Sequence, residues 1–241
     1  MIFSQSKLLN KFTNLTHCFT TRKSGNLAFH VNDNLLHVER NHEVLAKELN
    51  YNKNSLIHMK QIHSNSLHVV SKDDDFYNPK TCDALITNKP NTPLMVMVAD
   101  CSPILFYDEK LKVIAVAHAG REGTFKNINK VVIESFTNHF HSQISSLHVA
   151  IGASIGVCCY EVGLEIYKEA KELNLEYAIE FRDNSYYLNI RKILKQQLLE
   201  LGVKDKYIEI SQECNCCQND KYFSYRADNK TGRFSAIIQL K

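Results

Sequence analysis

The sequence predicts an α+β fold: a single-domain sandwich of mixed β-sheets with flanking helices. Many apolar segments are short and rich in β-branched residues, which is typical of strands. A few longer segments carry the apolar periodicity of helices and lie scattered between the strands. The 241 residues contain four prolines, eight glycines and no linker-like stretch or repeat, so we expect one domain over residues 1–241.

The first half of the chain is predicted to consist mainly of strands. Short apolar patterns place them at residues 17–22, 56–60, 67–70, 84–87, 94–99, 104–107 and 113–117. One helix is expected over residues 38–49. The uninterrupted apolar run that begins at Leu94 ends in Asp100 and Cys101, and Pro103 is expected to stop it.

The second half is predicted to alternate helices and strands. Helices are expected over residues 127–140, 164–173 and 190–201, and strands over residues 147–152, 207–211 and 234–240. The last helix has an apolar stripe that includes Ile193, Leu194 and Leu198, and Gly202 closes it.

Composition and charge exclude several classes of protein. The 29 basic and 26 acidic residues leave a net charge of +3, and no long Lys/Arg block is present, so nucleic-acid binding is not expected. The first residues lack the charged start and apolar core of a signal peptide. No apolar run approaches the roughly 18 residues of a membrane span. We therefore expect a soluble, cytoplasmic protein that does not bind membranes.

The eight cysteines are many for such a chain. Disulfide frameworks are typical of small secreted domains, so buried thiols are the simple interpretation. The alternative is that one or two of them bind metal or act as nucleophiles. Cysteines cluster at Cys158-Cys159 and at Cys214-x-Cys216-Cys217. No second Cys/His pair follows the later cluster, so the sequence does not predict a closed structural zinc site there.

One cysteine and two histidines stand where apolar strand patterns end: His63, Cys101 and His118. A thiolate and two imidazoles can hold a zinc ion and leave its fourth position open, as in catalytic sites. Such a zinc ion lowers the pKa of a bound water to about 7. Asp100 is the nearest carboxylate by sequence to handle protons, and Glu122 is the second candidate. Spacing alone does not separate this metal site from a Cys101–His118 dyad.

Arginines near these motifs are candidates for anion binding. The strand that ends in His118 runs into a glycine-flanked turn with Arg121, and this geometry suits an anion. Arg22 ends an earlier strand, and Arg226 follows an aromatic segment near the C-terminus. A separate pair, His139-x-His141, is half of a copper-binding pattern and is interpreted as a solvated helix end.

Several stretches together resemble the laccase-domain, YfiH-type family, whose members are described as purine nucleoside phosphorylases and as polyphenol oxidases. They follow the family's order across nearly the whole chain: Phe19-Thr20-Thr21-Arg22, Gln61-Ile62-His63, Asp83-Ala84-Leu85-Ile86-Thr87, Val98-Ala99-Asp100-Cys101-Ser102-Pro103, His118-Ala119-Gly120, Ile155-Gly156-Val157-Cys158-Cys159-Tyr160-Glu161-Val162, Phe223-Ser224-Tyr225-Arg226 and Thr231-Gly232-Arg233. The family usually reads His-Ala-Gly-Trp-Arg-Gly at the turn after His118, whereas this chain has Arg121-Glu122 there and no tryptophan anywhere.

The resemblance implies that His63, Cys101 and His118 are zinc ligands and that Arg22 lies at the pocket. It also implies a fold similar to the cytotoxic necrotizing factor catalytic domain. The implied activities are phosphorolysis of adenosine, inosine and S-methyl-5′-thioadenosine, and deamination of adenosine. The partners would be purine nucleosides and phosphate, with a homodimer as the candidate assembly. Cys101, His118, His63 and Asp100 are the expected catalytic residues.

Two alternatives from other classes remain at this point. One is a copper-dependent polyphenol oxidase that uses Cu²⁺ in place of Zn²⁺. The other is a metal-free cysteine hydrolase with Cys101 as nucleophile and His118 as base. Metal content and product analysis distinguish these two alternatives from the zinc-dependent nucleoside enzyme.

Overall fold

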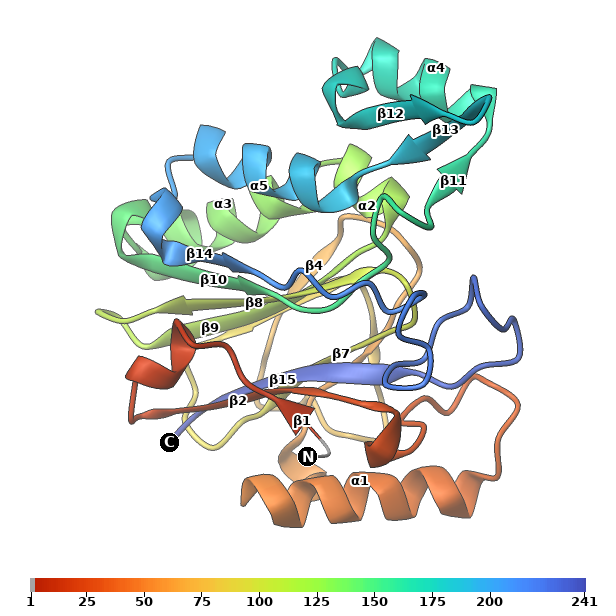
Figure 1. Ribbon diagram of the computed structural model, residues 1–241. Coiled ribbons are helices and arrows are strands. Elements are labelled where there is room, and N and C mark those ends of the chain that lie inside the picture. The colour runs from red at the N-terminus through yellow and green to blue at the C-terminus, as the bar shows by residue number, and fades with distance from the viewer. Residues whose placement is uncertain (1–2) are drawn as a thin grey trace.

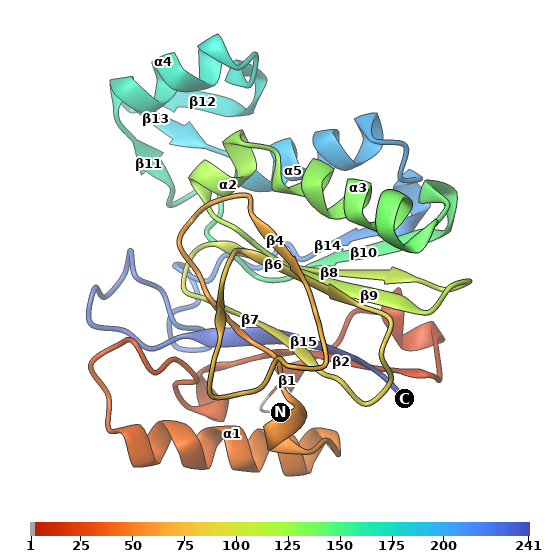
Figure 2. The same ribbon diagram turned by 180° about the vertical axis from the view of Figure 1, so that it is seen from behind.

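A computed structural model describes residues 3–241. Their helices and sheets are stacked in layers (Figure 1). Helices α3 (Ile128–Phe140) and α5 (Ile190–Glu200) cover one sheet, a second sheet lies beneath the first, and helix α1 (Leu35–Leu49) covers the far side. Figure 2 shows the same order of layers from behind. The predicted α+β sandwich with mixed sheets and flanking helices is confirmed. The narrower comparison with cytotoxic necrotizing factor stays a prediction.

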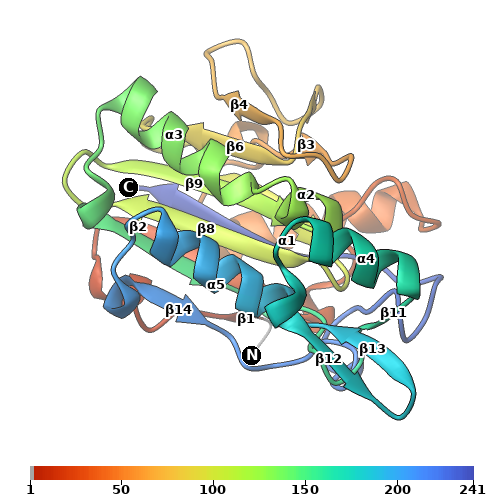
Figure 3. The same ribbon diagram turned by 90° about the horizontal axis from the view of Figure 1, so that it is seen from above.

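The larger sheet has six strands in the order β14-β10-β8-β9-β6-β4. Its outer pairs β10–β14 and β4–β6 are parallel and its inner pairs are antiparallel. The strands are β4 (Leu67–Val69), β6 (Ala84–Thr87), β8 (Ser102–Asp108), β9 (Val113–Ala119), β10 (Leu147–Ile151) and β14 (Ile208–Ile210). Figure 3 shows α3 and α5 lying side by side across this sheet.

The smaller sheet has four antiparallel strands in the order β1-β2-β15-β7. They are β1 (Phe3–Ser4), β2 (Leu15–Thr20), β7 (Leu94–Val98) and β15 (Phe234–Leu240). Strand β7 belongs to this sheet and the next strand, β8, to the larger one. The chain therefore crosses between the sheets at residues 99–101, the segment that carries Asp100 and Cys101.

Smaller elements surround the sandwich. A three-stranded sheet, β11-β13-β12, stands beside α4 at the upper right of Figure 1. A short parallel pair joins β3 to β5, and α2 follows β9 directly. The bounds are β3 (Met59–Lys60), β5 (Lys80–Thr81), α2 (Arg121–Phe125), β11 (Glu161–Val162), α4 (Leu164–Glu172), β12 (Ile179–Arg182) and β13 (Ser185–Leu188).

Strand alternation divides the apolar core into layers. On β9, Ala115 and Ala117 pack toward the helices with Phe136 of α3, whereas Ile114 and Val116 pack between the sheets. A third cluster lies between the smaller sheet and α1. Because side chains alternate along a strand, His118 follows Ile114 and Val116 on the face between the sheets. The alternation thus aims this histidine toward the crossing segment.

The expected elements agree well with the observed ones, although the short strands β1, β5 and β11 were not expected and several bounds shift by a few residues. Pro103 does not end the strand that starts at Leu94: β7 ends earlier, at Val98, and Pro103 is the second residue of β8. The chain bends instead at Asp100, whose φ is +88°. The hairpin β12–β13 was not expected, because the apolar alternation of β12 (Ile-Glu-Phe-Arg) spans only four residues and most residues of both strands are half-buried or exposed. Among residues 3–241, no helix is long and apolar enough to cross a membrane.

Candidate metal centre

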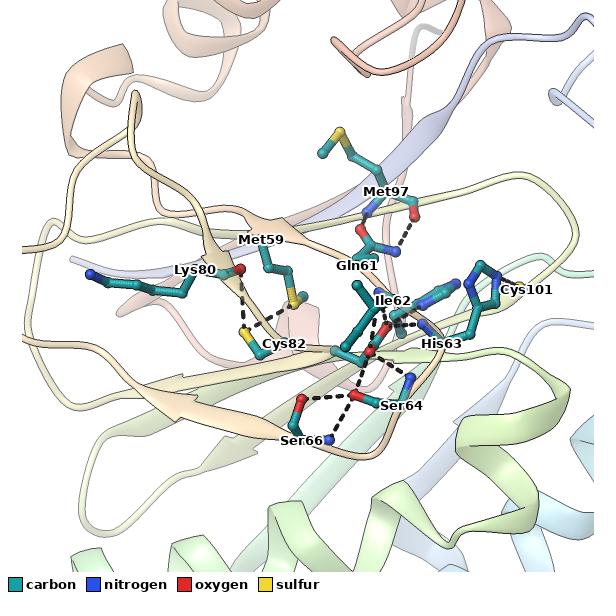
Figure 4. Close-up of polar contacts among 12 residues, drawn as sticks. Met59, Gln61, Ile62, His63, Ser64, Ser66, Lys80, Cys82, Met97 and Cys101 are labelled. Carbon is teal, nitrogen blue, oxygen red and sulfur yellow. Dashed lines mark hydrogen bonds and ion pairs between the residues drawn. The ribbon is translucent and has the colours of Figure 1, made fainter.

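The structure brings His63, Cys101 and His118 together at one end of the sandwich. Their donor atoms all lie within 4.8 Å of one another. Cys101 Sγ is 3.9 Å from His63 Nε2, and the two imidazole rings meet edge to face with centroids 4.8 Å apart. Figure 4 shows His63 and Cys101 facing each other at the end of the loop that follows β3. A triad that the sequence only suggested is therefore close in space.

A buried carboxylate, Asp83, organises two of the three donors. Its Oδ1 lies 2.8 Å from His118 Nδ1 and accepts the backbone N–H of His63 at 3.1 Å. Its Oδ2 accepts both the backbone N–H and the hydroxyl of Ser64 at 2.7 Å. Asp83 is fully buried. A carboxylate on Nδ1 fixes the ring so that Nε2 is the free donor, as in many metal sites.

The loop that carries His63 is also attached to the smaller sheet. The Gln61 amide donates to the Met97 carbonyl at 2.7 Å and accepts the Met97 N–H at 2.9 Å (Figure 4). His63 itself has a φ of +59°, a left-handed conformation that non-glycine residues adopt sparingly. Gln61 and Asp83 hold the loop in this conformation, which places the imidazole against Cys101.

The charges within the triad support one another. Burial alone would raise the pKa of the Cys101 thiol, but the neighbouring His118 and His63 outweigh it and lower the pKa to about 6. Burial alone would lower the pKa of His118, but the Cys101 thiolate and Asp83 raise it to about 9. Burial raises the pKa of Asp83, and hydrogen bonds from His118 and Ser64 more than offset this and lower it to about 2. The site therefore favours a thiolate at neutral pH, which is the form that binds metal.

The donor set and its spacing fit a metal ion. Tetrahedral bond lengths of about 2.3 Å to sulfur and 2.0–2.1 Å to nitrogen place the donors about 3.5 Å apart, close to the observed 3.9 Å between Cys101 and His63. The backbone also leaves room beside the donors. A Cβ at Gly120 would lie 3.0 Å from Cys101 Sγ and 3.0 Å from His63 Cδ2. Three protein donors leave a further position free for a ligand.

His63, Cys101 and His118 line one pocket of about 350 Å³. This volume lies in the range of sites for small molecules. Apolar and aromatic side chains form part of the wall, among them Ile155, Tyr160 and Tyr225. The pocket therefore combines a metal-binding end with a surface suited to a flat ring.

Asp100 lies beside the donors and is tied to the opposite wall. Its carboxylate accepts the Ser224 hydroxyl at 2.7 Å and the Arg226 backbone N–H at 2.6 Å. Of the described residues that line the pocket, Asp100 is the only carboxylate. Glu122, the second candidate from the sequence, is not among the lining residues and pairs with Arg121 and Lys126 instead.

Three arginines line the pocket and differ in their availability. Arg121 pairs with Glu169 at 2.6 Å. Arg226 donates to the backbone carbonyls of Cys159 and Glu161, and Arg233 to those of Thr231 and Gly232. Within residues 3–241, neither Arg226 nor Arg233 forms an ion pair with a carboxylate. Both retain their charge for an anion.

Arg22, in contrast, is not brought to this pocket. Its guanidinium lies over the Phe223 ring, 4.5 Å from the centroid, and its Nε donates to the Tyr222 carbonyl at 3.4 Å. It borders a separate hollow with Asn26 and Asp33. His139 and His141, at the end of α3, are exposed as expected for a solvated helix end.

Sequence reasoning missed some residues of the site. Asp83 was named only within a stretch that resembles the family and was given no role, although an acidic residue directly before a buried strand is a usable signal. Arg233 was noted in a motif without a role, and His30 received none. Both line the pocket. Burial, together with the charges of Arg233 and His118, lowers the pKa of His30. No local pattern in the sequence connects these residues to the donors.

The fold and the donor set describe an α+β protein with a pocket whose donors could hold a metal ion. The family described as "Multi-copper polyphenol oxidoreductase laccase" matches residues 16–241, and the chain belongs to this laccase-domain family. Membership implies a metal-binding role, for which His63, Cys101 and His118 are the candidate donors.

Curated relatives and solved structures agree with this assignment. The chain is 28% identical to the purine nucleoside phosphorylase YlmD of Bacillus subtilis over 92% of this chain and 87% of that protein. It is 33% identical to a purine nucleoside phosphorylase of Clostridium acetobutylicum, over 92% and 90% of the two chains. The structure of the hypothetical protein YfiH of Bacillus licheniformis superposes with a TM-score of 0.90 at 29% identity, over 97% and 94% of the two chains. The structure of YlmD from Geobacillus stearothermophilus superposes with a TM-score of 0.89 at 26% identity, over 100% of this chain and 99% of that chain.

Proposed function

We propose that this protein is a zinc-dependent purine nucleoside phosphorylase that cleaves adenosine, inosine and S-methyl-5′-thioadenosine and also deaminates adenosine. The observation that carries the proposal is one pocket of about 350 Å³ that joins the donors His63, Cys101 and His118 to Arg226 and Arg233. The names of the relatives, purine nucleoside phosphorylases, support the same reaction class.

His63, Cys101 and His118 would hold the zinc ion, with Asp83 fixing the two histidines. When bound, zinc supplies a Lewis acid that polarises a substrate atom or lowers the pKa of a water. Thiolate and imidazole donors suit zinc.

Phosphate binding is assigned to the two arginines without carboxylate partners. Each guanidinium offers a planar fork of N–H donors that matches phosphate oxygens. Arg226 lies 5.4 Å from the Tyr160 centroid and Arg233 lies 6.0 Å from that of Tyr225, so each rests over an aromatic ring that also lines the pocket. His30 adds an uncharged imidazole at the same wall. A phosphate held there would face a nucleoside stacked on the tyrosines.

In phosphorolysis, a phosphate oxygen bonds to the sugar C1′ while the C1′–N9 bond breaks and its electron pair goes to the purine. The arginines position the attacking oxygen and spread its charge. The departing purine must gain a proton, and Asp100 is the lining carboxylate that can take this proton from the attacking phosphate and pass it on. Deamination of adenosine makes a similar demand, since a proton must leave the water that attacks C6 and a proton must reach the leaving amine.

Product analysis tests the proposal. The protein is incubated with adenosine or inosine, with and without phosphate, and ribose 1-phosphate, free base and inosine are quantified. We expect base and ribose 1-phosphate in equal amounts, formed only with phosphate, and inosine from adenosine in either condition. The absence of ribose 1-phosphate from a zinc-loaded protein would overturn phosphorolysis, and the absence of inosine would remove deamination alone.

A second candidate is a cysteine hydrolase that needs no metal. The low pKa of Cys101, about 6, and the chain of contacts from Cys101 through His118 to Asp83 resemble the nucleophile–base–carboxylate arrangement of such enzymes. Alkylation by iodoacetamide distinguishes the two. If Cys101 is the nucleophile of a metal-free hydrolase, its alkylation should abolish activity at the same rate with and without zinc. If Cys101 is a zinc ligand, bound zinc should slow its alkylation.

The copper-dependent polyphenol oxidase remains a third candidate because the family description names that activity. Two histidines and a cysteine also occur in copper sites. Titration of the metal-free protein with Cu²⁺ in the presence of a phenol tests it. Oxidation that rises with one copper per site would favour this candidate, and no rise would exclude it.

A further inference from the structure

Four thiols from two distant segments gather outside the site described above. The Sγ atoms of Cys158, Cys159, Cys214 and Cys217 all lie within 4.8 Å of one another. The first two follow β10 in the segment that precedes β11, and the last two follow β14. No second Cys/His pair lies downstream of Cys214 in the sequence, and the fold brings one from upstream, across the parallel strands β10 and β14.

The distances between these sulfurs fit a shared metal ion. Cys217 Sγ lies 3.5 Å from Cys158 Sγ and 3.3 Å from Cys159 Sγ. Bonds of about 2.3 Å from zinc to four tetrahedral thiolates place the sulfurs about 3.8 Å apart, whereas a disulfide requires about 2.05 Å. All four cysteines are free thiols in the structure. The spacing is therefore that of a four-thiolate centre and not of a disulfide pair.

Backbone N–H groups point at one of the sulfurs. Cys214 Sγ accepts the Gly156 N–H at 3.1 Å and a backbone N–H of Cys217. The second of these bonds lies within a Cys-x-x-Cys turn, a spacing typical of zinc ligand pairs. Cys214 is buried, whereas Cys158 and Cys217 are exposed. The centre has an anchored inner sulfur and an outer side through which an ion can enter.

Basic side chains surround the cluster and match its charge. Four thiolates around Zn²⁺ carry two net negative charges. The Arg182 guanidinium donates to the carbonyls of Val157 and Cys158 at 2.9 and 2.8 Å, and Arg226 donates to that of Cys159 at 2.9 Å. Arg191 packs against Gly156: a Cβ there would lie 2.7 Å from Arg191 Nη2 and 3.0 Å from Cys158 Sγ.

We propose that Cys158, Cys159, Cys214 and Cys217 bind a second metal ion, a four-coordinate structural Zn²⁺. On binding, the thiols lose their protons to solvent and each sulfur donates one electron pair to the ion, with no change in oxidation state. This centre is separate from the donors His63, Cys101 and His118 and does not depend on the activity proposed for them.

The position of this centre explains what it would stabilise. Asn215 binds Ser154 through its backbone N–H and the Phe223 carbonyl through its side chain, at 3.2 and 2.9 Å. The two segments that the ion would join also carry Tyr160 and Arg226 of the pocket wall. The metal would therefore fix the wall that faces the first site, without contacting a ligand in the pocket.

A variant that lacks the first site provides the cleanest test. Cys101→Ala protein, purified under reducing conditions and loaded with zinc, should keep one tightly held zinc per chain. Its X-ray absorption spectrum should show a shell of four sulfurs at about 2.3 Å and no nitrogen. Adding Cys217→Ser to the Cys101→Ala protein should remove this one zinc ion per chain. If that double variant does not fold, Cys101→Ala with Cys159→Ser tests the same loss of zinc.

Cys216 supplies the matched control, because it stands in the same turn but outside the cluster. Cys101→Ala with Cys216→Ser should keep the zinc and the four-sulfur shell. The proposal is overturned by a Cys101→Ala protein without zinc, by a shell that contains nitrogen or oxygen, or by a disulfide between Cys159 and Cys217 in the reduced preparation. Zinc loss from Cys101→Ala protein would leave the function proposed for the first site untouched, because that site is assayed in the wild-type chain.

Discussion

Replacing Asp83 with asparagine tests how one buried carboxylate controls the candidate metal centre. Asparagine keeps the size of the side chain but removes its charge and turns one acceptor oxygen into an amide donor. That donor would face the N–H groups of His63 and Ser64 or Nδ1 of His118, all of which now bind the carboxylate. The variant therefore disturbs two ligands without touching the metal position.

The expected size of the effect follows from these contacts. Removing an outer partner of a metal-bound histidine lowers metal affinity by about 10- to 100-fold, which is roughly 1.4–2.7 kcal/mol. Each hydrogen bond to a buried charge adds about 1.5–3 kcal/mol to stability, and at least one is lost. We expect Asp83→Asn to bind zinc about 10- to 100-fold more weakly and to unfold at a lower denaturant concentration.

Zinc affinity is measured by competition with a chelator, and stability by urea unfolding of the metal-free protein. Asp74→Asn is the matched control, because Asp74 is a second buried carboxylate and is not in contact with His63, Cys101 or His118. Its Oδ2 lies 2.7 Å from His68 Nε2 and accepts the Ser71 N–H at 2.7 Å. The control should lose stability and keep its zinc affinity. Wild-type affinity in Asp83→Asn, or an equal loss of affinity in both variants, would refute the reasoning.

Three further predictions concern other parts of the molecule. Gly120→Ala should weaken zinc binding, measured by the same competition, because its Cβ would lie 3.0 Å from Cys101 Sγ. Burial lowers the pKa of His17 and of His42 from 6.5 to about 4, so the fold keeps both neutral while the unfolded chain takes up protons. The unfolding free energy should thus be unaffected above pH 6.5 and fall towards pH 4 by about 3 kcal/mol per histidine. Phe136→Ala, in the core between α3 and the larger sheet, should cost about 3–5 kcal/mol in urea unfolding.

Each of these predictions has a contradicting result. Unchanged zinc affinity in Gly120→Ala would show that the donors can shift away from a Cβ without loss. A flat unfolding free energy between pH 6.5 and pH 4 would show that the two histidines titrate normally in the fold. A cost below about 1 kcal/mol for Phe136→Ala would show that the core refills the space.

The elements near the candidate site were predictable because each is a local pattern. Strand β9 is a run of small and β-branched apolar residues that places His118 near its end, and both features can be read from the sequence. The position of Cys101 after an uninterrupted apolar run is equally local. Convergence of His63, Cys101 and His118 was a hypothesis at that stage, because it depends on the chain passing from one sheet to the other at residues 99–101.

Contacts between distant segments could not be predicted in this way. Asp83 reaches His118 through the pairing of β6 with β9, 35 positions apart in the chain. Arg22 was expected to end a strand, but β2 ends at Thr20 and Arg22 begins a short 3-10 helix, where its guanidinium lies over the Phe223 ring and away from the pocket. The cluster of Cys158, Cys159, Cys214 and Cys217 was not predicted because its two halves follow different strands, β10 and β14, which are distant in the chain. In each case the information lies in the strand order and not in a local motif.

The proposed function requires that zinc at His63, Cys101 and His118 supports phosphorolysis of purine nucleosides. Its most direct test is the rate of ribose 1-phosphate formation from inosine and phosphate as zinc is titrated into metal-free protein. We expect a rate that rises with zinc to a plateau in the wild-type chain and stays at background in Cys101→Ala protein. Full activity in the metal-free protein, or a Cys101→Ala protein as active as the wild type, would contradict it.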